Sequence, residues 1–199
     1  MAKARCHAVF PTAIGECAIA WNDAGLVAIW LPSASPGALR RRLRSRWPDA
    51  EPAELSGEVA EIVEAIARLL AGEHVGFATA RLDLSDTDDF DRRVYAVTRG
   101  IAAGQVLTYG EIAARIAGGA TAREVGQSLG RNPWPIVVPC HRVVAAGNAL
   151  GGFSAPGGTA TKRRLLAIER ARRSGAPDLF DPPAGNALGG FSAPRSRRT

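Results

Sequence analysis

Two capping motifs in the second half of the chain constrain its fold more than any other feature. Thr108-Tyr-Gly-Glu111 and Thr121-Ala-Arg-Glu124 each place a Glu three residues after a Thr, the pattern of a helix N-terminal capping box. Apolar residues follow each box at helical spacing, and Gly118-Gly119 separates the two. The sequence therefore predicts two short helices joined by a glycine turn, the arrangement of a helix-turn-helix. Helical hairpins are common, so this pair alone leaves DNA binding open.

The first third of the chain has the pattern of a small β-sheet. Residues 18–21 and 26–31 are apolar and β-prone, and Asn22-Asp-Ala-Gly25 between them supplies a turn, so we expect a hairpin. Apolar spacing also predicts helices over 39–47, which is rich in arginine, and over 58–70.

The remainder is predicted to be mostly helical. A helix is expected over 90–101, a short buried strand over 136–138 closed by Pro139, a glycine-rich loop over 147–158 and a last helix over 161–173 with a basic outer face. The fold class is therefore α+β. A small N-terminal sheet domain with a flanking helix, 1–85, precedes a mostly helical domain, 86–174, which carries the helix-turn-helix and a cysteine loop.

The end of the chain repeats part of this loop. Residues 146–156 read AGNALGGFSAP, and residues 184–194 repeat them letter for letter. One copy is not a solenoid, which needs several stacked units. We expect 175–199 to be a disordered tail that holds a local duplication.

Charge and cysteine usage limit the class of protein. The chain has 199 residues and a formal net charge of +6, and this basic surplus is consistent with a polyanionic partner or with a generic arginine-rich protein. Its three cysteines are an odd number at no disulfide-like spacing, which favours a reducing compartment. With neither a secretory signal nor a membrane-length apolar run, a cytoplasmic protein with access to the nucleoid is expected.

Cys140 is the candidate nucleophile. It follows the predicted strand and Pro139, and His141 lies beside it. A thiol attacks only as thiolate, so it needs a base or a positive neighbour. Neighbouring side chains of an extended strand point apart, so contact with His141 requires a bend or a bridging water. A buried cysteine that serves only as a small hydrophobe is the alternative.

Glu169 is the candidate third member of this group. It lies one helical turn after Leu165 and Leu166, on their face, which predicts that it is partly buried. An unpaired buried carboxylate is costly, so His141 is its natural partner. Cys140, His141 and Glu169 would then be nucleophile, base and orienting acid. The alternative is a Glu that caps a backbone amide.

The segment Pro139-Cys-His-Arg-Val-Val144 resembles the active-site signature of the O6-alkylguanine-DNA alkyltransferases, the methylated-DNA–protein-cysteine methyltransferases. Four further segments resemble the same family, at 90–94, 104–113, 131–136 and 162–169. The N-terminal hairpin resembles that family more loosely. Together the resemblance covers about residues 8–171.

The resemblance implies a role for each matching residue. Cys140 would accept the alkyl group irreversibly, His141 would deprotonate it through a water, and Glu169 would orient the imidazole. Asn132 would hold the turn before the acceptor by hydrogen bonds. Tyr109 would contact the extruded nucleotide, at its phosphate or at the N3 edge of guanine.

The partner that the resemblance implies is double-stranded DNA containing O6-alkylguanine or O4-alkylthymine, bound by a monomer without a cofactor. Base flipping is required because the alkyl group is unreachable inside the duplex. Arg123 would fill the gap left by the base, while the small residues Thr121, Ala122 and Gly126 let their helix approach the minor groove. Val143, Phe153 and Ser154, together with Tyr109, would line the guanine pocket.

Two departures from the family pattern concern the pocket and a metal. Phe153 stands where the family usually has Tyr, and the loop is longer, so the pocket wall differs. Some relatives hold a structural zinc, for which Cys6, His7, Cys17 and His74 could be assembled here. Their spacings do not match those relatives, and we predict no metal.

Three other functions remain as alternatives. An alkyltransferase-like lesion-binding protein would lack the acceptor that Cys140 provides. A cysteine hydrolase would turn over repeatedly and leave Arg123 unexplained. A sequence-specific transcription regulator would need base-specific contacts in the major groove, for which the small residues of 121–126 offer few groups.

Overall fold

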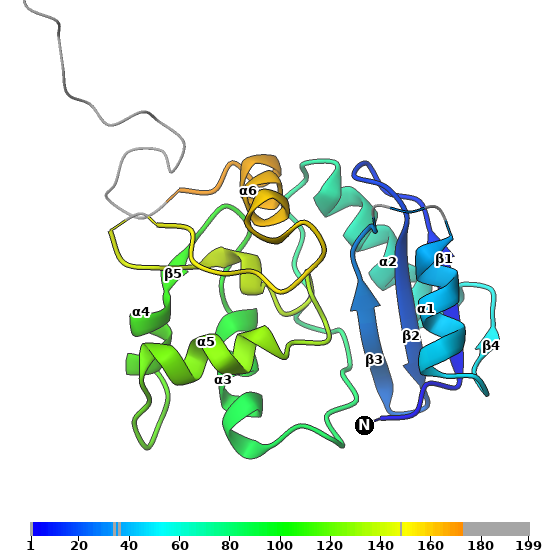
Figure 1. Cartoon of the computed structure of the whole chain (residues 1–199), viewed down its shortest axis with the longest axis horizontal. Coiled ribbons are helices and arrows are strands. Elements are labelled where there is room, and N and C mark those ends of the chain that lie inside the picture. The colour runs from blue at the N-terminus through cyan, green and yellow to red at the C-terminus, as the bar shows by residue number, and fades with distance from the viewer. Residues whose placement is uncertain (1, 34, 36, 148, 173–199) are drawn as a thin grey trace, which may run out of the picture.

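The computed structural model describes residues 2–33, 35, 37–147 and 149–172; the predicted tail, 175–199, lies outside the described residues. The α+β class is confirmed (Figure 1). No helix in the described part of the chain is both long and apolar enough to cross a bilayer. In chain order the elements are β1 (Cys6–Phe10), β2 (Cys17–Asn22), β3 (Gly25–Trp30), α1 (Ala38–Arg46), β4 (Glu51–Pro52), α2 (Gly57–Leu70), α3 (Asp89–Arg99), β5 (Leu107–Thr108), α4 (Tyr109–Ala114), α5 (Ala122–Gly130), the 3-10 turn η1 (Cys140–Arg142), β6 (Val143–Val144) and α6 (Gly158–Ile168).

The N-terminal sheet has the order β3-β2-β1-β4. The predicted hairpin is present as β2 and β3, which pair antiparallel with Ile19 opposite Ile29. The sequence analysis did not identify β1, which pairs antiparallel with β2, or the short β4, which runs parallel to β1.

The two faces of this sheet pack against different partners. Ala18 and Ala20 of β2 lie in one buried cluster with Leu43 and Trp47, on the side of α1. The alternate residues, such as Ile19, lie in a second cluster with the apolar stripe of α2. The sheet therefore lies between α1 and α2, where one flanking helix was predicted (Figure 1).

The second cluster continues into the rest of the molecule. It joins Ile29 and Ile66 to Val94, Trp134 and Leu165 in one set of buried side chains. Backbone contact reinforces this packing, because the Ile29 amide donates to the Pro133 carbonyl oxygen over 2.9 Å. The predicted domain boundary between residues 85 and 86 stays a prediction. Side chains from before and after this boundary pack in one common core.

The helix-turn-helix is confirmed as α4 and α5. In each capping box the Thr hydroxyl accepts from the backbone amide of the Glu, and the Glu carboxylate accepts from the Thr amide. In the second box these bonds join Thr121 and Glu124, at 3.2 and 2.8 Å. Val125 and Leu129 bury the inner face of α5, which leaves its first turn exposed.

The strand predicted over 136–138 is wrong, because this segment is a turn. Its flanking prolines, Pro135 and Pro139, have no N–H to give to a sheet ladder. The Val138 amide instead bonds the Trp134 carbonyl oxygen over 2.8 Å, and Ile136 adopts φ 77°, in the left-handed region. The buried strand lies later, at β6, which pairs in parallel with β5.

The last helix is also displaced from its prediction over 161–173. α6 begins at Gly158 and ends at Ile168, because Glu169 is its C-cap and Arg170 takes φ 50°. Its predicted basic face is correct for the exposed Arg163 and Arg164, but Lys162 is fully buried.

Candidate active site

Cys140 lies in η1, at the point where the turn of 131–139 meets β6. β6 pairs with β5, the strand directly before α4, and Leu107 lies opposite Val143. This pairing fixes the cysteine turn against the helix-turn-helix. The Cys140 side chain is nearly buried, with a relative exposure of 7%.

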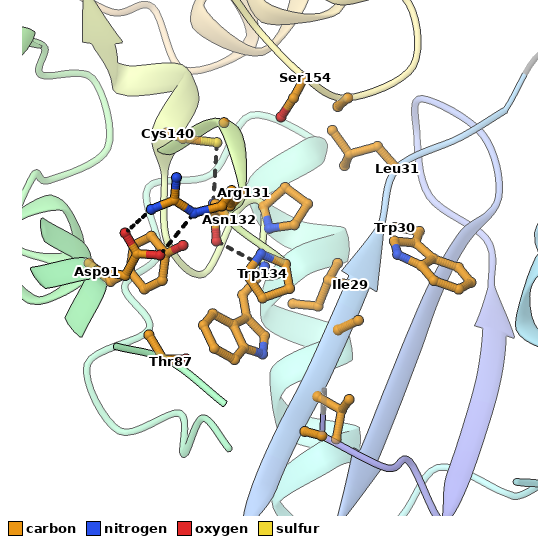
Figure 2. Close-up of a pocket in the computed structure, with 18 of the residues that line it drawn as sticks. Ile29, Trp30, Leu31, Thr87, Asp91, Arg131, Asn132, Trp134, Cys140 and Ser154 are labelled. Carbon is orange, nitrogen blue, oxygen red and sulfur yellow. Dashed lines mark hydrogen bonds and ion pairs between the residues drawn. The ribbon is translucent and has the colours of Figure 1, made fainter. Parts of the chain in front are cut away.

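Asn132 holds the turn that leads to Cys140 (Figure 2). Its side-chain amide donates to the Val138 carbonyl oxygen over 2.8 Å and to Cys140 Sγ over 3.3 Å. Its carbonyl oxygen accepts from the Trp134 amide over 2.9 Å. All three bonds lie within nine consecutive residues, so one side chain sets the conformation of the turn and contacts the sulfur.

His141 and Glu169 are in contact, as the helical stripe predicts. His141 Nε2 lies 2.8 Å from Glu169 Oε1, and both side chains are fully buried. Arg142 completes the cluster, since its Nε and Nη2 each donate to one carboxylate oxygen over 2.8 Å. His141 Nδ1, the other ring nitrogen, is buried and has no hydrogen-bond partner among the described residues.

The surroundings of this cluster lower the pKa values of both Glu169 and His141, for different reasons. Burial alone would raise the pKa of Glu169, but the hydrogen bonds and charges of His141 and Arg142 outweigh it and lower that pKa to about 2. Burial lowers the pKa of His141; the Glu169 contact opposes this, while Arg142 and Lys162 add to it. A neutral imidazole therefore faces an ionised carboxylate, and Nε2 carries the proton in their hydrogen bond.

Cys140 rests as a thiol. Burial raises the pKa of Cys140, and the Asn132 hydrogen bond, the Lys162 charge and two backbone amides only partly oppose that rise. The Lys162 ammonium donates to the Val143 carbonyl oxygen of β6 and to the Gly152 carbonyl oxygen of the glycine-rich loop. Burial lowers the pKa of Lys162 to about 8. A base must therefore take the thiol proton before the sulfur can attack.

A cavity of about 440 Å³ lies between α5 and the glycine-rich loop. Cys140 opens onto it, and three of the predicted pocket residues, Tyr109, Phe153 and Ser154, form part of its wall. Its volume falls in the range of small-molecule sites. The other described residues that line it are Ala122, Gly126, Leu129, Gly130 and Gly152.

The remaining predicted residues lie around this cavity. Thr121 and Arg123 are exposed on the first turn of α5. Val143 is not among the described residues that line the cavity, because it is fully buried in β6 and its carbonyl oxygen accepts from Lys162.

A second cavity of about 490 Å³ lies between β3 and the turn of 131–135, and it also reaches Cys140 (Figure 2). Trp30 and Leu31 line its sheet side, and Asn132 and Ser154 line its other side. Cys140 thus lines both the cavity beside α5 and the cavity beside the sheet.

Sequence reasoning missed Arg142 and Lys162 as members of the site. The signal for Lys162 was present, since positions 162, 165, 166 and 169 lie on one helical stripe, the same stripe that predicted a buried Glu169. Arg142 directly follows His141, but nothing in the sequence indicates that its side chain turns inward.

The four residues considered as zinc ligands are spread across the fold. Cys6 and Cys17 lie at opposite ends of the β1–β2 pair, opposite Trp21 and Phe10. His74 instead contacts the backbone oxygen of Glu169. Within the described ranges, no three His, Cys, Asp or Glu side chains gather as metal ligands would.

Comparison with known proteins places this chain in a family. Residues 89–171 match the family model described as "6-O-methylguanine DNA methyltransferase, DNA binding domain". The methylated-DNA–protein-cysteine methyltransferase of Methanothermobacter thermautotrophicus is 32% identical over 160 residues, which cover 80% of this chain and 82% of the relative. That of Mycobacterium tuberculosis is 40% identical over 139 residues, which cover 69% and 78%.

Solved structures agree with this. The Mycobacterium tuberculosis OGT protein, crystallised in complex with DNA, superposes with a TM-score of 0.66 at 32% identity, over 88% of this chain and 99% of that one. The O6-methylguanine-DNA methyltransferase of Pyrococcus kodakaraensis gives 0.64 at 26% identity, over 82% and 98%. The chain therefore belongs to the methylated-DNA–protein-cysteine methyltransferase family.

Proposed function

We propose that this protein repairs DNA by transferring an alkyl group from O6 of guanine, or O4 of thymine, to Cys140 Sγ. The observation that carries the proposal is the position of Cys140, which opens onto the cavity beside α5 and belongs to the same short turn as His141, the buried partner of Glu169. Family membership supports the reaction type.

The proton of the thiol goes to His141. Nδ1 is the nitrogen that can accept it, because Nε2 already donates to Glu169. No described hydrogen bond joins Cys140 Sγ to Nδ1, so one water carries the proton between them. The Glu169 carboxylate then stabilises the imidazolium that forms.

Attack by the thiolate forms an S–C bond and breaks the C–O6 bond, and the electron pair stays on the base. Burial first, and Cys140 second, raise the pKa of Tyr109, so it remains a phenol that can donate a hydrogen bond to the departing guanine and stabilise the electron pair left on it. The thioether has no leaving route, so each molecule reacts once.

DNA binds across the first turn of α5. Ala122 and Gly126 lack large side chains where the duplex approaches, and the cavity between them and the loop receives the extruded nucleotide. Arg123 enters the base stack in its place. Phosphate contacts from the basic surface are independent of sequence, which suits a repair protein that scans DNA. We propose a monomer that needs no cofactor and works in the compartment that holds the DNA.

Intact-protein mass spectrometry tests this assignment. After incubation with an O6-methylguanine oligonucleotide, we expect a stoichiometric gain of one methyl group, located on Cys140 by peptide mapping. Cys140→Ala should gain none, whereas Cys6→Ala, which removes a cysteine of β1 far from the cavity, should still gain one. Repeated turnover, or no adduct on folded protein, would contradict the proposal and favour a hydrolase or a lesion-binding protein.

A further inference from the structure

The guanidinium of Arg142 lies inside the protein and has all its close contacts there. The side chain is nearly buried, with 3% relative exposure. Besides its two bonds to Glu169, Nη1 donates to the Ile101 carbonyl oxygen over 2.6 Å, just beyond the end of α3. A planar fork held at three points has one orientation, so both carboxylate oxygens are fixed as well.

The Arg142 guanidinium determines the charge of the carboxylate group that His141 contacts. Glu169 Oε1 accepts from both His141 Nε2 and Arg142 Nη2, while Oε2 accepts from Arg142 Nε. The carboxylate is therefore already neutralised by a cation before the imidazole contacts it. A buried carboxylate with no other partner would instead favour a protonated imidazole, which could not accept the thiol proton.

We propose that Arg142 is a positioning residue for the alkyl transfer: by clamping Glu169 it keeps His141 neutral, with its proton on Nε2 and with Nδ1, which has no partner among the described residues, left to accept the thiol proton. This inference rests on the proposed function. It assigns to Arg142 an effect on the base that is separate from any contact with DNA, because the side chain is nearly buried and its described hydrogen bonds go to Glu169 and to the Ile101 carbonyl oxygen.

Other charged groups around His141 do not replace this clamp. Lys162, on α6, donates to the Val143 and Gly152 carbonyl oxygens and makes no described bond to Glu169. His74 contacts the backbone oxygen of Glu169, at 3.1 Å, and Cys140 rests as a thiol. Among the described residues, Arg142 is thus the arginine or lysine that hydrogen-bonds the Glu169 carboxylate.

The substitution Arg142→Lys tests the clamp, because it keeps the charge and removes the fork. A single ammonium cannot hold both oxygens, so the carboxylate acts more strongly on His141 and its pKa rises. Since the base acts when neutral, the rising limb of the alkyl-transfer rate against pH should move upward by about one pH unit. On the acid side of this limb, where His141 becomes protonated in the variant but not in the wild type, the single-turnover rate should fall by up to roughly tenfold, while near pH 7 it should change little.

Arg99→Lys is the matched control. The Arg99 guanidinium also donates hydrogen bonds within the protein, to the carbonyl oxygens of Phe77, Ala78 and Ala80. It makes no described contact with the His141–Glu169 pair. This variant should lose stability while keeping the wild-type pH profile. A similar shift in both variants would assign Arg142 a structural role only and overturn the proposal.

A second measurement needs neither a variant nor a substrate. Nitrogen-15 NMR of the His141 ring in the wild-type protein should show the neutral form with its proton on Nε2 between pH 6 and 8. An imidazolium at pH 7 would overturn the proposal even if Arg142→Lys failed to fold. Because this spectrum involves no alkylated DNA, its outcome is independent of whether the methyl-transfer assay succeeds.

Discussion

Trp134 donates its indole N–H to the Leu26 carbonyl oxygen over 2.7 Å, and this bond ties the turn before Cys140 to the N-terminal sheet. The indole is buried, and its ring meets Tyr95 edge-on at 5.8 Å. The same turn contains Asn132, which contacts Cys140 Sγ. Two residues that are far apart in sequence thus connect the sheet to the position of the sulfur.

Trp134→Phe should lower stability by about 1–2 kcal/mol, because an aromatic ring remains but a buried hydrogen bond is lost. Urea denaturation followed by circular dichroism measures this free energy of unfolding. An unchanged midpoint would mean that the bond contributes nothing beyond packing.

Arg123→Ala should weaken base flipping more than DNA affinity. The guanidinium is exposed on the first turn of α5, where it can fill the stack in place of the lost base. Fluorescence of a 2-aminopurine beside the lesion reports flipping, and anisotropy reports affinity. Arg115→Ala, at the exposed end of α4, controls for loss of charge and should act alike on damaged and undamaged duplex. If Arg123→Ala reduced flipping and affinity equally, it would not be the finger.

Gly151→Ala should slow alkyl transfer by roughly tenfold, because the added Cβ displaces Tyr109 in the cavity wall and so misplaces the substrate. Cys140 itself is unchanged. Gly151 has φ 68°, and a Cβ there would lie 2.9 Å from Tyr109 Cε2. Gly147→Ala is the control for backbone strain, since it has φ 67° and open space around its Cβ. The prediction fails if both variants slow the reaction to the same extent.

Lys162→Met should change how stability depends on pH. The pKa of Lys162 is about 8 when folded, below its ordinary value of 10.5, so between these values the unfolded chain binds more protons than the folded one. Unfolding free energy therefore rises with pH across this window, by up to about 3 kcal/mol. The variant should lose this rise. Chemical denaturation at pH 8 and pH 10 measures the difference, and equal slopes for both proteins would refute a buried ammonium.

Local patterns predicted the parts of the fold that depend on neighbouring residues. The hairpin follows from two apolar, β-prone segments around a four-residue turn, and both capping boxes form because each Thr and Glu satisfy one another's backbone. The burial of Glu169 follows from its position after Leu165 and Leu166. In these cases a few consecutive residues contain the whole physical reason.

The rest could not be predicted because it depends on which groups meet in the folded chain. Residues 136–138 have the composition of a strand, yet Asn132 donates to the Val138 carbonyl oxygen and the Val138 amide donates to the Trp134 carbonyl oxygen, so the segment forms a turn. The helical stripe indicates that Lys162 faces inward, but its partners, carbonyl oxygens of β6 and of the loop, are revealed by no spacing in the sequence. Arg142 turns inward for Glu169, which lies 27 residues later.

The common core described above has a consequence for the amount of repair that a cell can perform. Ile29 and Ile66 belong to the same packed cluster as Val138 and Val143, which flank the cysteine turn. Proteins are stable by only a few kcal/mol, so a cavity made at either isoleucine raises the fraction of molecules exposed to proteases. For a protein consumed one molecule per lesion, losing molecules to degradation is the same as losing repairs. Substitutions in the sheet, which contains none of the proposed DNA-contacting residues, would then lower the tolerated dose of alkylating agent.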